Sequence, residues 1–141
     1  MQVEQRQTES ERWALVAVAN VMHQRTVQKV LQQEGFNTVT ASDTDSAMAA
    51  LEDQVGAFQL LLLDFDLPGL GALDVLRVYT YLTIDTQAGA IVRIAEQTEE
   101  SLVSCLAAGV DQCLPIPTDC ERLRATVRAL LPRRVMAQAV C

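Results

Sequence analysis

Residues 60–77 read Leu-Leu-Leu-Leu-Asp-Phe-Asp-Leu-Pro-Gly-Leu-Gly-Ala-Leu-Asp-Val-Leu-Arg. The run of leucines has the length of a strand, is too short to cross a bilayer, and is typical of a parallel strand buried on both faces. The strand ends at Asp64, and the proline and glycines that follow indicate a loop. Apolar residues then recur at helical spacing from Leu73. In open α/β sheets functional groups gather outside the carboxyl ends of the strands, so Asp64 marks a candidate site.

Strand and helix patterns alternate along the rest of the chain. Strands are predicted over residues 13–19, 36–41, 60–64, 90–94 and 112–114, each followed by a helix. Thr98 is predicted to cap the fourth helix, and the fifth is predicted to end before Pro132. The fourth helix is predicted to bury a stripe made of Leu102, Val103, Leu106 and Ala107. Strict alternation with short loops specifies an α/β fold, a doubly wound parallel sheet with helices on both faces.

The length and the net charge of the chain limit the number of domains and the kinds of partner that are expected. With 141 residues, of which 50% are hydrophobic, the chain is expected to form one domain over residues 12–131. Residues 1–11 are expected to be a flexible arm, and residues 132–141 a C-terminal tail or linker. The net charge of −7 disfavours nucleic acid and anionic membrane as partners of the domain. No segment reaches the ~18 apolar residues of a membrane span, and a cytoplasmic location is expected.

The cysteines and the histidine exclude several kinds of chemistry. Cys105, Cys113, Cys120 and Cys141 contain no Cys-x-x-Cys pair and are interpreted as small hydrophobic residues in a reducing compartment. His23 is the only histidine and has no neighbouring ligand set, so neither a metal site nor a nucleophile–base pair is predicted, and the chain is not expected to be an enzyme. A small-molecule site at the same edge of the sheet stays open, although no glycine-rich phosphate loop follows the first strand.

Several motifs, taken together in their order and spacing, resemble the receiver domain of two-component response regulators. They are the apolar strand that ends at Asp64, the Asp-x-x-Leu-Pro-Gly loop, the Ala108-Gly109 pair before the fifth strand, and Pro117 after it. The resemblance covers about residues 12–131. It implies a flavodoxin-like sheet of five strands in the order 2-1-3-4-5, and it suggests a cis peptide between Ile116 and Pro117.

In that family the central aspartate accepts a phosphoryl group from a histidine kinase, and an acidic pair, a Thr or Ser and a Lys surround it. The resemblance places Asp64 at the phosphoacceptor position. The acidic pair, the hydroxyl and the ammonium fall on apolar residues, namely Val18, Ala19, Ile94 and Ile116, and a further aromatic position falls on Cys113. Phosphoryl transfer needs a metal and fixed cations, and losing one such group costs about a hundred- to a thousand-fold in rate.

We therefore expect no Mg²⁺ site and no other cofactor. Asp64 is expected to accept hydrogen bonds from loop amides, and Asp66 to be a solvated loop acid. A further hypothesis is that the four apolar replacements fill the former phosphorylation pocket.

The favoured interpretation is a degenerate receiver that works as a phosphorylation-independent interaction module in bacterial two-component signalling. Its partners would be an output domain, a histidine kinase or a second copy of the chain. The alternative is a phosphoacceptor receiver that a histidine kinase phosphorylates on Asp64. Charged residues in the last two helices form a candidate partner face, unless they merely solvate those helices: Glu99, Glu100, Arg122, Arg124 and Arg128.

Overall fold

The leucines of residues 60–63 form most of the central strand of the sheet. The computed structural model describes residues 12–53, 57–82 and 89–140. Its strands are β1 (Arg12–Ala17), β2 (Phe36–Ala41), β3 (Leu60–Asp64), β4 (Gly89–Ile94) and β5 (Gln112–Pro115). All pairings are parallel and the order is β2-β1-β3-β4-β5, which confirms the predicted topology. Every residue of β3 and β4 is buried, as expected of strands covered on both faces.

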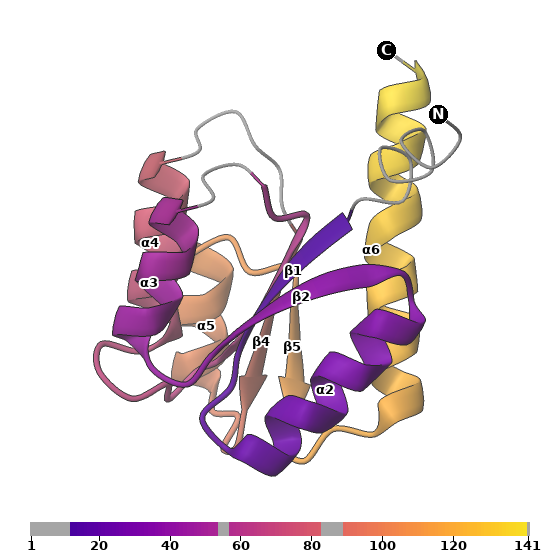
Figure 1. Ribbon diagram of the computed structural model, residues 1–141. Helices are drawn as coiled ribbons and strands as arrows, with labels where there is room; N and C mark the ends of the chain where they lie inside the picture. Colours follow the sequence, from indigo (N-terminus) through magenta and orange to yellow (C-terminus); the bar gives the residue numbers. More distant parts are fainter. Residues whose placement is uncertain (1–11, 54–56, 83–88, 141) are drawn as a thin grey trace.

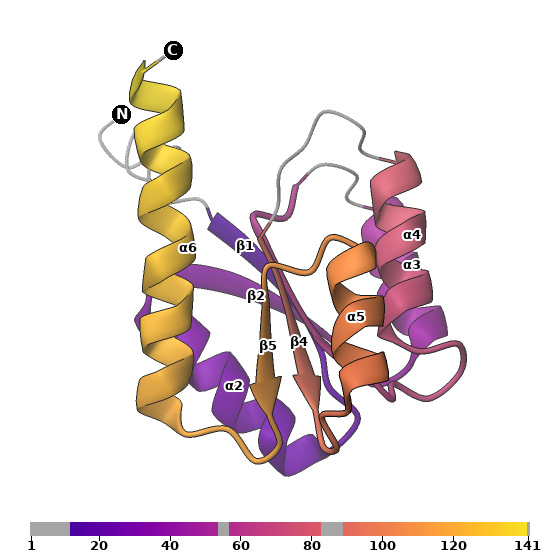
Figure 2. The ribbon, with the colours of Figure 1, turned by 180° about the vertical axis from the view of Figure 1, so that it is seen from behind.

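Five helices cover the two faces of the sheet. They are α2 (Val21–Gln33), α3 (Thr44–Asp53), α4 (Ala72–Leu82), α5 (Glu99–Ala107) and α6 (Cys120–Val140). Helices α2 and α6 lie on one face, and α3, α4 and α5 lie on the other (Figures 1 and 2). Alternate residues of the strands feed two separate hydrophobic clusters, so that Leu61 and Leu63 pack on one face and Leu60 and Leu62 on the other.

Charged side chains hold α6 against α2. Glu34, just after α2, accepts hydrogen bonds from Nε and Nη2 of Arg128 at 2.7 and 2.9 Å. The Nε of Arg124 lies 3.9 Å from the same carboxylate, and its Nη1 donates to Glu121 at 2.6 Å. The hydrogen bonds from Arg128, together with the charges of both arginines, hold the pKa of Glu34 below its ordinary value. These contacts join two helices that cover the same face of the sheet.

Thr44, the first residue of α3, fixes the loop that follows β3. Its backbone N–H donates to the carbonyl of Pro68 at 2.9 Å. Its hydroxyl Oγ1 donates to the same carbonyl at 3.3 Å and accepts the N–H of Leu70 at 3.1 Å. Gly69 lies so close to this hydroxyl, at a φ of +107°, that a side chain there would collide with it. The loop is thus attached to a neighbouring helix directly after the candidate aspartate.

The fourth predicted helix differs from the structure in the side that faces the core. Val103 and Leu106 are exposed, by 57% and 75%, whereas Ser101 and Cys105 are buried. A capping box between Thr98 and Ser101 sets the start of α5, which confirms Thr98 as the cap. This start turns Ser101 and Cys105 inward. The predicted apolar stripe was therefore wrong for three of its four residues, because Ala107 is exposed as well as Val103 and Leu106.

One strand and one helix end at other residues than the sequence predicted. Strand β1 ends at Ala17, two residues before the predicted end, and the N–H of Ala19 donates to the Asp64 side chain. Helix α6 continues through Pro132 to Val140, so the prediction that it ends before this proline was wrong. A proline removes one helical hydrogen bond, but the Arg, Met, Ala and Gln residues around it favour the helix.

The remaining expectations concern the N-terminal arm, one peptide bond and membrane-spanning segments. The predicted arm (residues 1–11) lies outside the described residues. The peptide between Ile116 and Pro117 is cis, as the resemblance suggested. Among the helices that the structure describes, none combines the length and the apolar character needed to cross a membrane.

Candidate functional site

Asp64 ends the central strand and keeps only 8% of its surface exposed. Its Oδ2 accepts the backbone N–H of Ala19, which follows β1, at 3.3 Å. The prediction places the donors in the loop after Asp64, but no described amide of that loop donates to this carboxylate. Its Oδ1 accepts a hydrogen bond from Nε of Arg93 at 2.7 Å. Both carboxylate oxygens therefore have a donor from the protein itself.

Arg93 lies in β4 beside Asp64. The two residues are register partners on neighbouring parallel strands, so their side chains leave the sheet on the same side. Arg93 is 3% exposed and forms a buried ion pair with the carboxylate. A buried carboxylate needs such a partner, because an uncompensated charge in the interior costs several kcal/mol by general estimates, about 3–5.

His23 extends this polar arrangement to α2. Its Nδ1 lies 3.3 Å from Nη2 of Arg93. A guanidinium can only donate, so Nδ1 acts as the acceptor and the ring proton of the neutral imidazole is assigned to Nε2. Asn20 caps α2 by accepting the backbone N–H of His23 at 3.0 Å, and this places the imidazole at the carboxyl edge of the sheet.

The sequence interpretation did not single out Arg93 or this position of His23. The available signal was Arg93 itself, the only charged residue in the apolar run of β4. A charge inside such a run requires a partner on a neighbouring strand, and the register supplies Asp64.

The four apolar positions do not fill one pocket together. Val18 is fully buried in the cluster beneath α2 and α6, whereas Ile94, 1% exposed, packs in the cluster beneath α3, α4 and α5. Ala19 is exposed and Ile116 is half-buried. The side chain that contacts Asp64 is the guanidinium of Arg93. The hypothesis that the four apolar residues fill one pocket beside Asp64 is therefore wrong.

A Mg²⁺ ion does not fit the arrangement around Asp64. Val18 and Ala19 offer no side-chain oxygen, and the carboxylate of Asp64 is already bound by Arg93 and by the Ala19 amide. Mg²⁺ requires oxygen ligands in near-octahedral geometry. Within the described residues no three His, Cys, Asp or Glu side chains are grouped closely enough to hold a metal ion.

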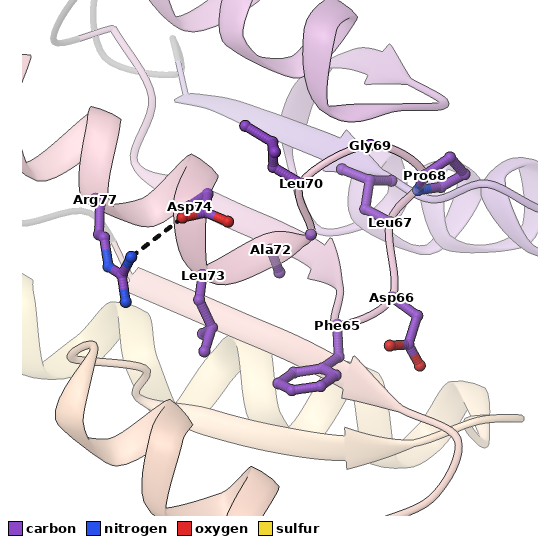
Figure 3. Close-up of a pocket in the computed structure, with 11 residues that line it drawn as sticks. Phe65, Asp66, Leu67, Pro68, Gly69, Leu70, Ala72, Leu73, Asp74 and Arg77 are labelled. Atoms are coloured by element: carbon purple, nitrogen blue, oxygen red, sulfur yellow. Dashed lines mark hydrogen bonds and ion pairs between the residues drawn. The ribbon is translucent and has the colours of Figure 1, made fainter.

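The loop after β3 borders a hollow of about 500 Å³, lined by residues 65–74 and Arg77 (Figure 3). Asp66 is exposed in this loop, as predicted for a solvated acid. Asp74 and Arg77 form an exposed ion pair of 3.2 Å in α4, whereas Asp66 lies at the other end of the loop. No described contact joins Asp66 to Asp64, so the hollow is not part of the buried arrangement.

The residues of the candidate partner face are distributed over two sides of the molecule. Glu99 and Glu100 are exposed in the first turn of α5, and Arg122 is exposed in α6. Arg124 and Arg128 instead contact Glu34, near α2. The exposed apolar residues Val103 and Leu106 lie on α5 with the two glutamates. Whether these residues bind a partner stays a prediction.

Three of the cysteines are free thiols in the described part of the chain. Cys105 is fully buried, and Cys113 and Cys120 are half-buried, which fits their interpretation as small hydrophobic residues. Burial, with a smaller contribution from the neighbouring Cys113, raises the pKa of Cys105 to about 12. This thiol therefore stays protonated near neutral pH.

Comparisons with known proteins show the family of this chain. The model of the response regulator receiver domain matches residues 15–128. The transcriptional regulatory protein CpxR of Klebsiella pneumoniae is 36% identical over 107 residues, which make up 76% of this chain and 44% of that protein. The phosphate regulon transcriptional regulatory protein PhoB of Klebsiella pneumoniae is 32% identical over 111 residues, or 79% of this chain and 47% of PhoB. The chain thus spans less than half the length of these curated relatives.

Solved structures show the same fold. The crystal structure of a CheY-like response regulator receiver domain protein from Methanospirillum hungatei JF-1 gives a TM-score of 0.80 at 20% identity, covering 90% of this chain and 98% of that one. At 20% identity, this similarity is evidence for a shared fold and not for a shared function. The family match extends over most of the domain and includes Asp64 at the end of the central strand. This chain accordingly belongs to the receiver domains of two-component response regulators.

Proposed function

We propose that this receiver domain signals without phosphorylation of Asp64 and acts as a protein-interaction module in bacterial two-component signalling. One observation carries the proposal: the buried ion pair of 2.7 Å between Arg93 and Asp64. In this proposal the domain is not an enzyme and binds no Mg²⁺ or other cofactor.

Two features of the site oppose phosphoryl transfer: the hydrogen bonds that hold Asp64, and the absence of charged groups at residues 18, 19 and 116. One carboxylate oxygen of Asp64 accepts a hydrogen bond from Arg93 and the other accepts one from the Ala19 amide. Attack on phosphorus would neutralise the carboxylate, and both hydrogen bonds would weaken as its negative charge is lost. The transferred group also needs a metal and cations placed around its own oxygens. Arg93 is directed at Asp64 and His23 instead, and residues 18, 19 and 116 supply no charge.

The partners in this proposal are signalling proteins, namely an output domain, a histidine kinase or a second copy of the chain. The surface of α5 is the preferred contact, because exposed Val103 and Leu106 lie there with Glu99 and Glu100. Apolar residues flanked by charges are typical of protein interfaces. Arg124 and Arg128 are less suited, since they contact Glu34 within the domain.

The alternative is a phosphoacceptor receiver with Asp64 as the acceptor. It is supported by the position of Asp64 at the carboxyl end of β3 and by relatives that are named as transcriptional regulators. For this alternative Arg93 would have to release the carboxylate.

The deciding experiment measures intact mass after incubation with acetyl phosphate and Mg²⁺. We expect no phosphoryl adduct on the wild-type chain. The control variant is Asp64→Ala, and a known active receiver domain confirms the reagents. A stoichiometric adduct on the wild type that is lost in Asp64→Ala would overturn the proposal and favour the alternative.

A thermal melt with beryllofluoride and Mg²⁺ gives an independent readout. A ligand that binds only the folded protein raises the melting temperature once its concentration exceeds the dissociation constant. We expect no shift beyond that of Asp64→Ala. A clear rise in the wild type alone would show that a phosphoryl mimic can displace Arg93.

Self-association through α5 is tested by sedimentation velocity over a range of protein concentrations. If a second copy is the partner, Leu106→Glu should abolish a dimer that the wild type forms, because it places a charge in the contact. A wild type that stays monomeric throughout would exclude the second copy and leave another signalling protein as the partner.

A further inference from the structure

A cavity of about 210 Å³ lies beside Arg93, between the sheet and the helices α2 and α6. Its lining includes His23, Thr26 and Val27 of α2, Arg93 of β4, Thr118 just before α6, and Leu123 of α6. This volume is below the usual range of drug-sized sites, about 300–1,000 Å³, so only a small ligand fits. The cavity is separate from the hollow along residues 65–77.

Arg93 leaves one nitrogen without a partner at this cavity. Its Nε donates to Asp64 and its Nη2 contacts His23, but Nη1 has no acceptor within the described part of the chain. No fully buried side-chain nitrogen or oxygen among the described residues lacks a hydrogen bond. Nη1 must therefore keep some accessible surface, although Arg93 as a whole is 97% buried, that is, 3% exposed. Arg93 lines the cavity, so Nη1 is the donor that this side chain has left to offer there.

His23 provides a second donor. Its Nδ1 is occupied as an acceptor by Arg93, so the N–H of the ring is at Nε2. The hydroxyls of Thr26 and Thr118 donate to the carbonyls of Met22 and Pro115, and they do not add donors to the cavity. The donors are thus a guanidinium N–H and an imidazole N–H, while Val27 and Leu123 provide apolar wall.

We propose that this cavity binds a small monocarboxylate. Its carboxylate accepts hydrogen bonds from Nη1 of Arg93 and Nε2 of His23, and its apolar body packs against Val27 and Leu123. Planar carboxylates match the geometry of guanidinium donors. Because Asp64 neutralises much of the Arg93 charge, affinity rests on two hydrogen bonds and a small apolar contact, and a dissociation constant of about 1 mM is expected.

The test is an NMR titration of the ¹⁵N-labelled full chain with benzoate and with butyrate. We expect saturable shifts of amide signals at residues 23–27, 93 and 118–123. The neutral amides benzamide and butyramide have the same shape and should bind about tenfold more weakly, since they place an N–H₂ group against a donor. Inorganic phosphate is titrated in parallel to separate planar carboxylates from oxyanions in general.

Matched variants locate the site. Thr26 and Arg25 are both exposed in α2, but only Thr26 lines the cavity. Thr26→Trp should block the cavity and abolish binding, whereas Arg25→Trp should bind like the wild type, and the spectra of both report whether they fold. His23→Phe keeps an aromatic ring but removes the Nε2 donor together with the Nδ1 acceptor of Arg93, and should weaken binding about tenfold.

Four results would each overturn the assignment. The first is the absence of shifts with either carboxylate at about ten times the expected dissociation constant. The others are equal binding of the amides, tighter binding of phosphate, and unchanged binding by a folded Thr26→Trp. Each result is independent of the mass measurement on Asp64, so failure here leaves the proposed function untouched.

Discussion

Asp64 and Arg93 are register partners on β3 and β4, and their side chains meet in a buried ion pair with Nε 2.7 Å from Oδ1. The position that the family resemblance assigns to the phosphoacceptor carries here a carboxylate with an internal counter-ion. This relationship connects the stability of the domain to its proposed lack of phosphorylation.

Arg93→Met should destabilise the domain by about 3–5 kcal/mol, because it leaves the buried Asp64 charge without a partner. The double variant Arg93→Met with Asp64→Asn should recover part of this loss, since the remaining group is neutral. Urea denaturation measures both. The control is Arg77→Met, which removes an exposed ion pair with Asp74 and should change stability by about 0.5 kcal/mol or less. Equal effects of the two arginine variants would contradict the assigned role of Arg93.

Phosphorylation should be recoverable by a triple variant, Ala19→Asp, Ile116→Lys and Arg93→Leu. Ala19 is exposed and Ile116 half-buried, so both can carry a charge, whereas Val18 is left in the core. Restoring stabilising groups should raise the rate about a hundredfold or more. Intact mass with acetyl phosphate and Mg²⁺ should show one adduct, which Asp64→Ala in the same background should abolish. A folded triple variant without an adduct would mean that Arg93 and these positions do not limit the reaction.

Gly69→Ala should cost more stability than Gly35→Ala. Both glycines have a positive φ, +107° and +94°, so a side chain strains the backbone at each, by about 1 kcal/mol. At Gly35 nothing lies within 4 Å of the added Cβ, but at Gly69 it meets the hydroxyl of Thr44. We expect an additional loss of about 1–2 kcal/mol at Gly69. Thr44→Ala should reduce that additional loss; if the two glycine variants unfold alike, the contact with Thr44 is unimportant.

Glu34→Gln should lower the melting temperature by no more than a few degrees at neutral pH. The folded pKa of Glu34 is depressed, mainly by the hydrogen bonds from Arg128, so its contribution is full above the ordinary pKa near 4.5 and is lost as pH falls through the folded value. The difference between wild type and variant should accordingly shrink in acid. Glu52→Gln, at an exposed position of α3, serves as the control. A difference that persists unchanged at low pH would exclude an ionic origin.

Cys105 should react with iodoacetamide at pH 8 about a hundredfold more slowly than Cys120, as measured by peptide mapping over time. Its pKa is raised to about 12 by burial, so little thiolate is present, and the side chain is inaccessible in the folded state. Urea should remove the difference. Fast labelling of Cys105 in the native protein would show that α5 opens from the sheet.

The pattern of residues alone was sufficient for the architecture. The apolar runs and their spacing predicted five strands in alternation with helices, because burial on two faces requires such runs and a parallel crossover requires a helix. Caps at Asn20 and Thr98 and left-handed glycines at Gly35 and Gly109 are local features with local causes. The sequence prediction failed where two local signals disagreed. In α5 the capping box at Thr98 disagreed with the apolar stripe, and in α6 Pro132 disagreed with the helix-favouring residues around it.

The sequence by itself determined the fold and the position of Asp64 at the end of the central strand. Only the tertiary structure decided what surrounds that carboxylate, because the register of β3 against β4 places Arg93 beside it and the start of α2 places His23 beside Arg93. The sequence separates Arg93 from Asp64 by 29 positions and from His23 by 70. Contacts over such distances depend on how strands and helices pack together, and a local pattern of residues does not contain them.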